Sequence, residues 1–197
     1  MPFYLKDRDI SSDVATVRSV LIVPCRFCPA ASFAVRERKP YIELFGGLLR
    51  TASYEAYIQM LKSRLERKGI RTGVFDSRLP HQFVACMWTL ARRKELARRA
   101  VGYDAVIVLG CDAAVEMIRS CLHSMSCPVI PGMKVEGIMN VIPTFKVPFN
   151  ISLKVSGVTR VLQPHAAAED SCQVPERDDL TLHQATISLC TTAMRSD

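Results

Sequence analysis

The chain has 197 residues, of which 49% are hydrophobic and 23% are charged, and it carries a net charge of +7 and eight cysteines. These values are ordinary for one globular domain with a full core and a short appendage. The N-terminal residues mix charges and lack the apolar core of a secretory signal, and no apolar run approaches the roughly 18 residues of a membrane span. We therefore expect a cytoplasmic protein with reduced cysteines and no membrane partner.

Strand and helix patterns alternate along the first two thirds of the chain. Short β-branched runs bounded by breakers predict strands at 19–24, 70–75, 103–110 and 127–130. Apolar residues that recur every three or four positions predict helices at 53–68, 81–100 and 112–125. The inner face of the second helix would comprise Phe83, Val84, Met87, Leu90, Ala91 and Ala97. Residues 25–47 are expected to form a long loop, with room for a helical turn.

This alternation predicts an α/β fold, with a three-layer, doubly wound and mostly parallel sheet. Residues 1–132 would form the α/β domain. Residues 133–163 have no helical period and are predicted to be a β-rich extension of the same domain, with strands interrupted at Pro143, Pro148 and Gly157. Residues 164–197 are expected to be an acidic, loosely held tail.

The charge of the chain is unevenly distributed. Residues 1–163 contain 24 Lys and Arg against 13 Asp and Glu, whereas residues 164–197 contain 2 against 6. Much of the basic surplus lies on two predicted helices, and it includes Arg92, Arg93 and Arg98. Such faces are either solvated helix surface or a docking surface for an acidic partner. A nucleic-acid partner is not expected, because no aromatic residues are interleaved with the charges.

Four cysteines are placed where a common site can form. Cys25 and Cys28 follow the first predicted strand, and Cys111 follows the third. Sites in open α/β sheets lie at the carboxyl ends of the strands, so these thiols are expected to meet there. Cys86, from the intervening segment, would supply a fourth ligand. In a reducing compartment, four converging thiolates indicate a metal or iron–sulfur site more than a disulfide.

Each of these cysteines also has other interpretations. An isolated Cys-x-x-Cys pair is compatible with half of a zinc site, half of an iron–sulfur site or a thiol redox pair. The position of Cys111 at a strand-to-helix turn favours a stabilised thiolate. The remaining cysteines are expected to be small buried or exposed side chains, namely Cys121, Cys127, Cys172 and Cys190. His81 is a substitute ligand should Cys86 lie elsewhere.

Several motifs occur in an order that is typical of one family. They are Val20-Leu-Ile-Val-Pro-Cys25-Arg-Phe-Cys28, Cys86-Met-Trp-Thr-Leu, Gly102-Tyr-Asp-Ala-Val106, Cys111-Asp-Ala-Ala-Val-Glu116 and Pro128-Val-Ile-Pro131. With these motifs, residues 19–145 resemble the methylenetetrahydrofolate reductase C-terminal domain family, the cysteine-rich module of the small partner subunit in acetogen-type reductases. The chain departs from the family in lacking its downstream cysteine-rich segment. It also has Asp112 and Ala114 in place of two glycines.

The resemblance implies an accessory protein of anaerobic one-carbon metabolism that relays electrons to, or supports, a folate- or corrinoid-dependent partner enzyme. It implies that Cys25, Cys28, Cys86 and Cys111 hold a [4Fe–4S] cluster or, alternatively, zinc. No catalytic residue is predicted, so the chain would be a non-catalytic or electron-transfer subunit. Two alternatives remain open, a thiol–disulfide oxidoreductase using Cys25 and Cys28 and a structural zinc-binding interaction module.

Overall fold

The computed structural model describes residues 2–37, 41–43, 51–76, 82–146 and 150–160. Residues Met1–Leu162 form one compact unit, and Gln163–Asp197 form a second unit that lies outside the described residues. The predicted acidic tail, 164–197, falls in this second part. None of the helices in the described ranges has the length and apolar character required to cross a membrane.

The centre of the fold is a four-stranded parallel sheet, as the strand patterns predicted. Its strands are β2 (Ser19–Pro24), β4 (Arg71–Val74), β5 (Ala105–Leu109) and β6 (Val129–Pro131). They are arranged in the order β4-β2-β5-β6. The chain steps from β2 outward to β4 and then back across β2 to β5. This places a change of winding direction between β2 and β5.

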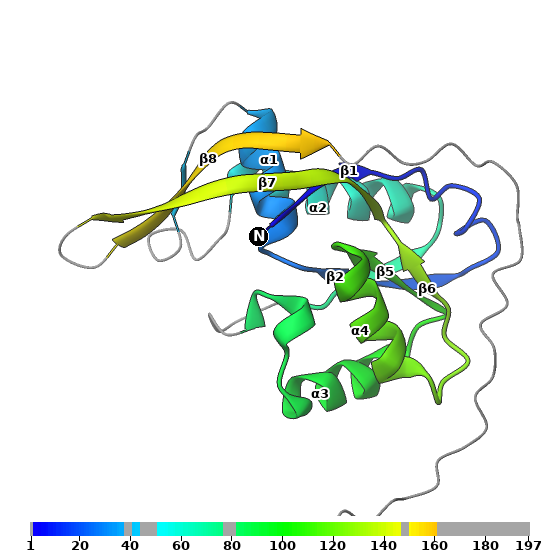
Figure 1. The fold of residues 1–197 in the computed structure, drawn as a ribbon. Helices are drawn as coiled ribbons and strands as arrows, with labels where there is room; N and C mark the ends of the chain where they lie inside the picture. The colour runs from blue at the N-terminus through cyan, green and yellow to red at the C-terminus, as the bar shows by residue number, and fades with distance from the viewer. Residues whose placement is uncertain (1, 38–40, 44–50, 77–81, 147–149, 161–197) are drawn as a thin grey trace, which may run out of the picture. The chain divides into compact units, whose positions relative to one another are not determined.

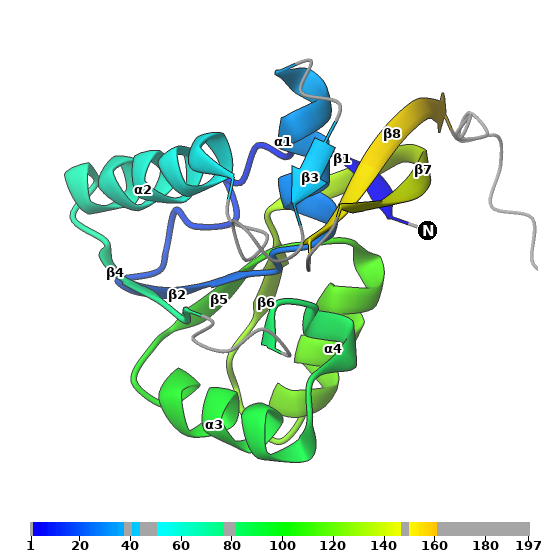
Figure 2. The same cartoon turned by 90° about the vertical axis from the view of Figure 1, so that its left-hand side faces the viewer.

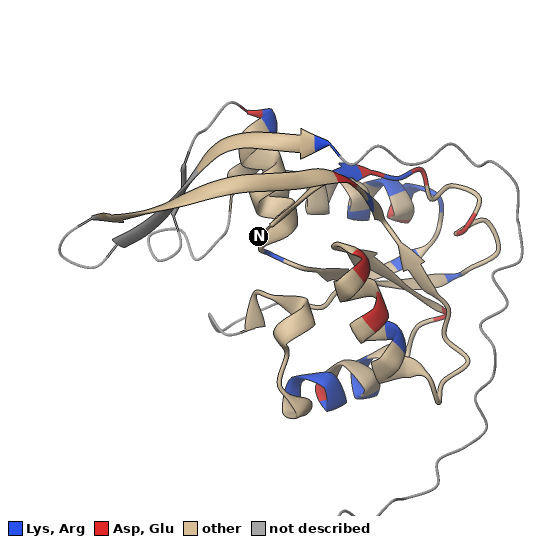
Figure 3. Ribbon diagram, viewed as in Figure 1, with Lys and Arg blue, Asp and Glu red and all other residues tan. Residues whose placement is uncertain are grey.

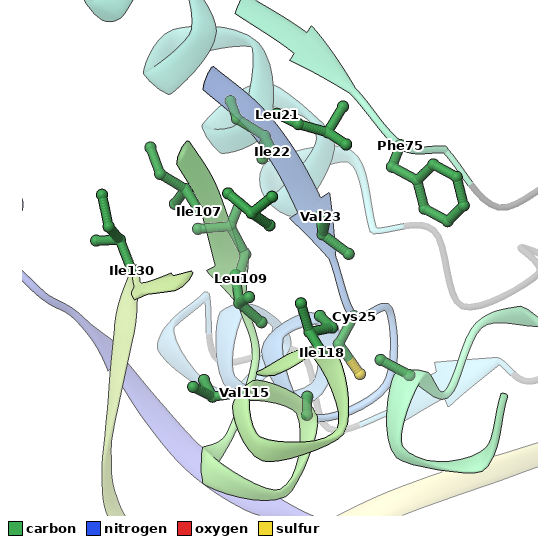
Figure 4. Close-up of a cluster of buried hydrophobic side chains, with 14 of the residues drawn as sticks. Leu21, Ile22, Val23, Cys25, Phe75, Ile107, Leu109, Val115, Ile118 and Ile130 are labelled. Carbon is green, nitrogen blue, oxygen red and sulfur yellow. The ribbon is translucent and has the colours of Figure 1, made fainter. Parts of the chain in front are cut away.

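Helices cover both faces of this sheet. Figure 2 shows α2 (Ala52–Arg67) on one side, with α3 (Leu90–Ala100) and α4 (Asp112–Leu122) on the other. Every residue of β2 and β5 is buried, because strands covered on both faces cannot alternate polar and apolar residues. Figure 4 shows the resulting core, in which side chains of β2 and β5 pack against Val115 and Ile118 of α4.

A second sheet is antiparallel and separate from the first. Its order is β1-β7-β8-β3, from Phe3–Asp7, Met133–Lys146, Asn150–Arg160 and Tyr41–Glu43. The β-rich segment that follows residue 132 therefore pairs with the N-terminal strand β1, which the sequence patterns did not predict. Figure 1 shows β7 continuing from β6, so that one stretch of chain joins the two sheets. Gly132 lies between β6 and β7, and a Cβ at this position would come within 2.7 Å of the Leu109 side chain, so a residue without a side chain is needed there.

The interruptions predicted at Pro143 and Gly157 are wrong, because β7 and β8 run through these residues and pair them with Leu153 and Asn140. Pro148 lies outside the described residues. β1 pairs with β7 only as far as Ile138. After Ile138, the edge of β7 that faces away from β8 has no strand partner among the described residues. Proline is tolerated on such an edge because no ladder hydrogen bond requires its missing N–H.

Two predicted segments also differ from the structure. Within the predicted loop 25–47, residues Cys28–Arg36 form helix α1, in which Pro29 occupies the first turn and three alanines favour the helix. The predicted helix 81–100 is divided into the 3₁₀ turn η2 (Ala85–Met87) and α3, which begins only at Leu90. Thr89 caps α3, and its side chain accepts a hydrogen bond from the backbone N–H of Arg92.

The predicted inner face of that segment is partly wrong for the same reason. Met87 and Leu90 are 74% and 67% exposed, and Ala91 is exposed as well. The buried residues of α3 are instead Arg92, Leu96 and Ala100. Starting the helix at residue 90 and not near 81 changes which residues share its buried side.

Candidate functional site

Cys25 and Cys111 lie just beyond the carboxyl ends of two neighbouring strands. Pro24 and Leu109 are register partners at the ends of β2 and β5, and the Cys25 N–H donates to the Leu109 carbonyl at 2.8 Å. A Cβ on Gly110 would lie 3.2 Å from the Cβ of Cys25 and 2.9 Å from that of Ala114. Glycine at this position lets the two cysteine-bearing turns approach closely. The turns lie where the winding of the sheet reverses, which is the usual position of sites in open α/β sheets.

Cys28 is the first residue of α1, and its sulfur faces both the sheet edge and strand β1. It is 7% exposed, and its Sγ accepts a hydrogen bond from the Phe3 N–H at 3.4 Å. The thiol also hydrogen-bonds to Cys111, and this bond, followed by burial, raises the pKa of Cys28. Because α1 begins directly after the Cys25 turn, both cysteines of the pair reach the same end of the sheet.

Cys111 precedes α4 and is 4% exposed. The hydrogen bond from Cys28 lowers its pKa to about 6, and the backbone N–H groups of Ala113 and Ala114 act in the same direction. Burial opposes this shift but is the weaker effect. A lowered thiol pKa is the direction expected for a sulfur at the start of a helix, where backbone N–H groups stabilise the thiolate.

Cys86 differs from the other three because it lies in the 3₁₀ turn η2 and is exposed. Its pKa is raised by burial of part of its side chain and by the negative charge of Cys111. Burial raises the pKa of Cys25 to about 11, and the charges of Cys111 and Cys86 contribute to that rise. Charges on Cys25 and Cys111 likewise raise the pKa of Cys28. Cys111 thus lies within electrostatic range of each of the other three cysteines, and we call these four residues the thiol group.

The four cysteines of the thiol group are not arranged as metal ligands in this structure. Among the described residues, no set of three or more His, Cys, Asp or Glu side chains is arranged to hold a metal ion. All six cysteines of the described ranges are free thiols. The assignment of Cys25, Cys28, Cys86 and Cys111 as metal ligands stays a prediction. His81, the proposed substitute ligand, lies outside the described residues.

The other cysteines lie elsewhere in the fold. Cys121 in α4 is half-buried and its thiol contacts the Met117 sulfur at 3.5 Å. Cys127, before β6, donates to the Tyr103 carbonyl at 3.7 Å. Cys172 and Cys190 fall outside the described residues. Cys121 and Cys127 are therefore suitable controls for experiments on the thiol group.

Arg26, inside the Cys-x-x-Cys turn, is a site residue that the sequence analysis missed. The residue is 1% exposed, and its side chain forms ion pairs with Glu55 of α2 and with Asp76 after β4, the latter at 2.7 Å. Its backbone N–H donates to the Phe83 carbonyl at 2.8 Å. Arg26 therefore ties the turn that carries Cys25 and Cys28 to three other segments. Its position between two cysteines was the only sequence signal for this role. The burial of Arg26 could not be predicted from it, because that burial depends on Glu55 and Asp76, which are distant in the chain.

Comparison of the chain with protein families, with curated proteins and with solved structures found no match. The resemblance described above therefore rests on the motifs alone.

Proposed function

We propose that this chain is an accessory metal–thiolate protein, with Cys25, Cys28, Cys86 and Cys111 as ligands of a [4Fe–4S] cluster or of zinc. One observation supports the proposal: Cys25, Cys28 and Cys111 are buried near the carboxyl ends of β2 and β5, and the charge of Cys111 raises the pKa of each of the other three thiols, Cys86 included. Within a three-layer, doubly wound arrangement, this is the position at which a site is expected.

The chemistry of the donor set fits both candidate groups. Zinc in structural sites and [4Fe–4S] clusters each take four thiolates. Cys111 is already stabilised as a thiolate, and the N–H groups of Ala113 and Ala114 would partly neutralise the charge of a bound group. A cluster, when bound, would supply one-electron transfer, whereas zinc would supply structural cross-linking. Cys25, Cys28 and Cys111 are buried and Cys86 is exposed, so one edge of the site would face solvent.

The wider role follows from the family resemblance. In that role the protein acts in the cytoplasm, in anaerobic one-carbon metabolism, beside a folate- or corrinoid-dependent enzyme. It relays electrons to that partner or supports it, and has no small-molecule turnover of its own.

A thiol–disulfide oxidoreductase is the second candidate, favoured by the hydrogen bond between a thiol at Cys28 and a thiolate at Cys111. This pair, and not Cys25 with Cys28, has the protonation states of a reduced redox pair. In such an enzyme, the two sulfurs would form a disulfide while a substrate disulfide accepts their two electrons and the one proton of the Cys28 thiol, and leaves as one thiol and one thiolate. Exposures of 7% and 4% argue against direct attack on a large substrate.

The test is anaerobic reconstitution of the full chain with iron and sulfide, or with zinc, followed by metal analysis and absorption spectroscopy. We expect stoichiometric metal in the wild-type protein and in the control variants Cys121→Ser and Cys127→Ser. Serine at any position of the thiol group should remove most of the metal, because one ligand of four is lost. Full metal content in Cys86→Ser would exclude Cys86 as a ligand. Failure to bind either metal, together with a reversible Cys28–Cys111 disulfide, would replace the proposal with the oxidoreductase.

A further inference from the structure

The segment that carries the exposed thiol also carries two exposed apolar side chains. Met87 is 74% exposed and Leu90 is 67% exposed, within four residues of Cys86. Single exposed apolar residues are common on protein surfaces. Met87 and Leu90 are two large ones close in the chain to the exposed Cys86, and we call them the apolar patch, because grouped apolar side chains often mark interaction surfaces.

This patch is held in place by residues on either side of it. Trp88, between Met87 and Leu90, is 3% exposed, and its ring meets that of Phe75 edge-on with 5.5 Å between centroids. The indole N–H donates to the Gln82 carbonyl at 2.6 Å, and the Arg93 side chain donates to the Trp88 carbonyl at 3.0 Å. The backbone is thereby anchored while its neighbours point outward. A partner could therefore bind this patch without the entropy cost of ordering its backbone.

Basic residues continue the patch along α3. Leu90, Lys94 and Arg98 are four residues apart and exposed, so they form one ridge of the helix, and Arg99 is exposed beside it. Figure 3 shows the concentration of blue on α3. The single carboxylate of the helix, Glu95, is paired with Arg92 at 2.7 Å.

Arg92 does not belong to this surface, which corrects the set predicted from the sequence. It is 6% exposed, and its guanidinium lies 3.8 Å from the centre of the Phe75 ring. Its charge is also matched by Glu95, whereas Lys94, Arg98 and Arg99 make no ion pair with any residue in the described ranges. The exposed face of α3 therefore has a net positive charge that runs along the helix from the apolar patch at its start.

We propose that this docking surface binds an acidic protein that covers the open edge of the thiol group. The docking surface comprises Cys86, Met87, Leu90, Lys94, Arg98 and Arg99. The basic ridge would attract and orient the partner, and the two apolar side chains would supply contact area that excludes water. A nucleic acid fits less well, because the aromatic residue of the segment, Trp88, is buried and unavailable for stacking on bases. The position over Cys86 rests on the proposed function, but the docking itself can be measured without metal.

The test uses a small acidic ferredoxin as the probe and the full chain in both metal-free and iron-reconstituted forms. We expect binding at low salt that weakens at least tenfold at about 0.15 M salt, because exposed charges are then screened. The triple variant Lys94→Glu, Arg98→Glu, Arg99→Glu should also weaken binding at least tenfold. The matched control is Arg64→Glu, Arg67→Glu, Lys68→Glu, which makes the same charge change on α2 and should change binding less than twofold.

A zero-length carbodiimide cross-linker locates the contact, because it joins lysine amines to carboxylates that lie in direct contact. Lys94 should be the main cross-linked lysine by mass spectrometry, and Lys94→Arg should remove that cross-link while keeping the binding. Serine at Met87 and Leu90 together should weaken binding about tenfold without changing its salt dependence.

Several results would overturn the docking surface. These are equal weakening by the α2 and α3 triple variants, absence of binding to the probe at low salt, and tighter binding of single-stranded DNA than of the probe through the same residues. Self-association that is lost on replacing Met87 and Leu90 would assign the surface to a second copy of this chain. Failure of metal reconstitution with α3-specific docking retained would count against the proposed function alone.

Discussion

The parallel and antiparallel sheets of this chain differ in how much of each strand the core buries. In the parallel sheet, β2 and β5 have no exposed residue, and they form the centre of a large apolar cluster. Among the described residues, the antiparallel sheet adds only Leu5 of β1 and Met133 of β7 to the buried residues of that cluster, and Met139 of β7 to a much smaller cluster with Ala31, Ala34 and Phe83. Ile142 and Phe145, toward the far end of β7, are 54% and 75% exposed. The thiol group is thus built on the more deeply buried of the two sheets, which suits a site that must hold its ligands in place.

Helix α1 links the two sheets at the thiol group. Its Ser32 hydroxyl accepts a hydrogen bond from the Leu5 N–H of β1 at 2.9 Å and donates to the Cys28 carbonyl at 2.8 Å. The Phe3 N–H of the same strand donates to the Cys28 sulfur. β1 therefore supports α1 from one side while the parallel sheet supports it from the other. The antiparallel sheet therefore helps to position the site, through the contacts of β1 with Cys28 and Ser32.

The largest difference between the sheets should appear on truncation of their isoleucines. Ile107→Ala in β5 removes a side chain with no exposed surface, and should lower the free energy of unfolding by roughly 2–5 kcal/mol. Ile142→Ala in β7 makes the same chemical change at a position that is 54% exposed, and should cost less than about 1 kcal/mol. Urea unfolding of both variants measures these effects. Equal losses of unfolding free energy in the two variants would mean that β7 is packed as tightly as β5, and would contradict the difference in burial between the two sheets.

Replacing Cys28 with alanine tests how far the link through α1 controls the site. Cys28 is the main cause of the low pKa of Cys111, about 6 against an ordinary 9.0. In the reduced, metal-free protein, Cys28→Ala should raise the pKa of Cys111 toward its ordinary value. Titration of thiolate ultraviolet absorbance from about pH 5 to about pH 11 measures the change. Cys121→Ala is the control and should leave the Cys111 titration in place.

The same variant should change how stability depends on pH. A thiol whose pKa is depressed on folding stabilises the folded state fully above its unfolded-state pKa, and this stabilisation is lost as pH falls through the folded pKa. For Cys111, the loss should run from about 9 down to about 6. Cys28, whose pKa is raised, stays protonated in the folded state and ionises in the unfolded state only as the pH approaches the ordinary 9.0, so it adds an opposing slope only at the top of this window. Urea unfolding of Cys28→Ala should therefore depend less steeply on pH, and an unchanged slope would contradict the assigned role of Cys28.

The sequence predicted the parallel sheet better than the antiparallel one for a physical reason. Continuous apolar runs such as Val20–Val23 and Ala105–Leu109 are required by burial on both faces and are visible locally. β1 is only five residues long and pairs with β7 more than 120 residues away, so nothing near it in the sequence indicates a partner. The sequence analysis placed the start of α3 too early because it assigned the apolar residues before Leu90 to one buried helix face. In the structure, Trp88 packs inward whereas Met87 points outward.

The candidate site was predictable only in part. The strand-end rule places Cys25 and Cys111 together without reference to side-chain contacts. It does not predict that Cys28 hydrogen-bonds to Cys111, because that bond needs α1 to begin at Cys28 where a loop was expected. Neither the exposure of Cys86 nor the burial of Arg26 is encoded locally. Both depend on segments brought in by the fold, η2 for Cys86 and the carboxylates of Glu55 and Asp76 for Arg26.

The smallest effect is expected at the exposed end of the antiparallel sheet. Phe145 is 75% exposed although it is a large aromatic residue in a strand. Phe145→Thr keeps the strand preference of a β-branched residue and removes little buried area, so the free energy of unfolding should change by less than about 0.5 kcal/mol. Urea unfolding of this variant beside the wild-type protein measures the change. A loss above about 1 kcal/mol would mean that the ring is buried in solution, against another part of the chain or a second copy. The dependence of that loss on protein concentration would separate the two, since only association between copies strengthens with concentration.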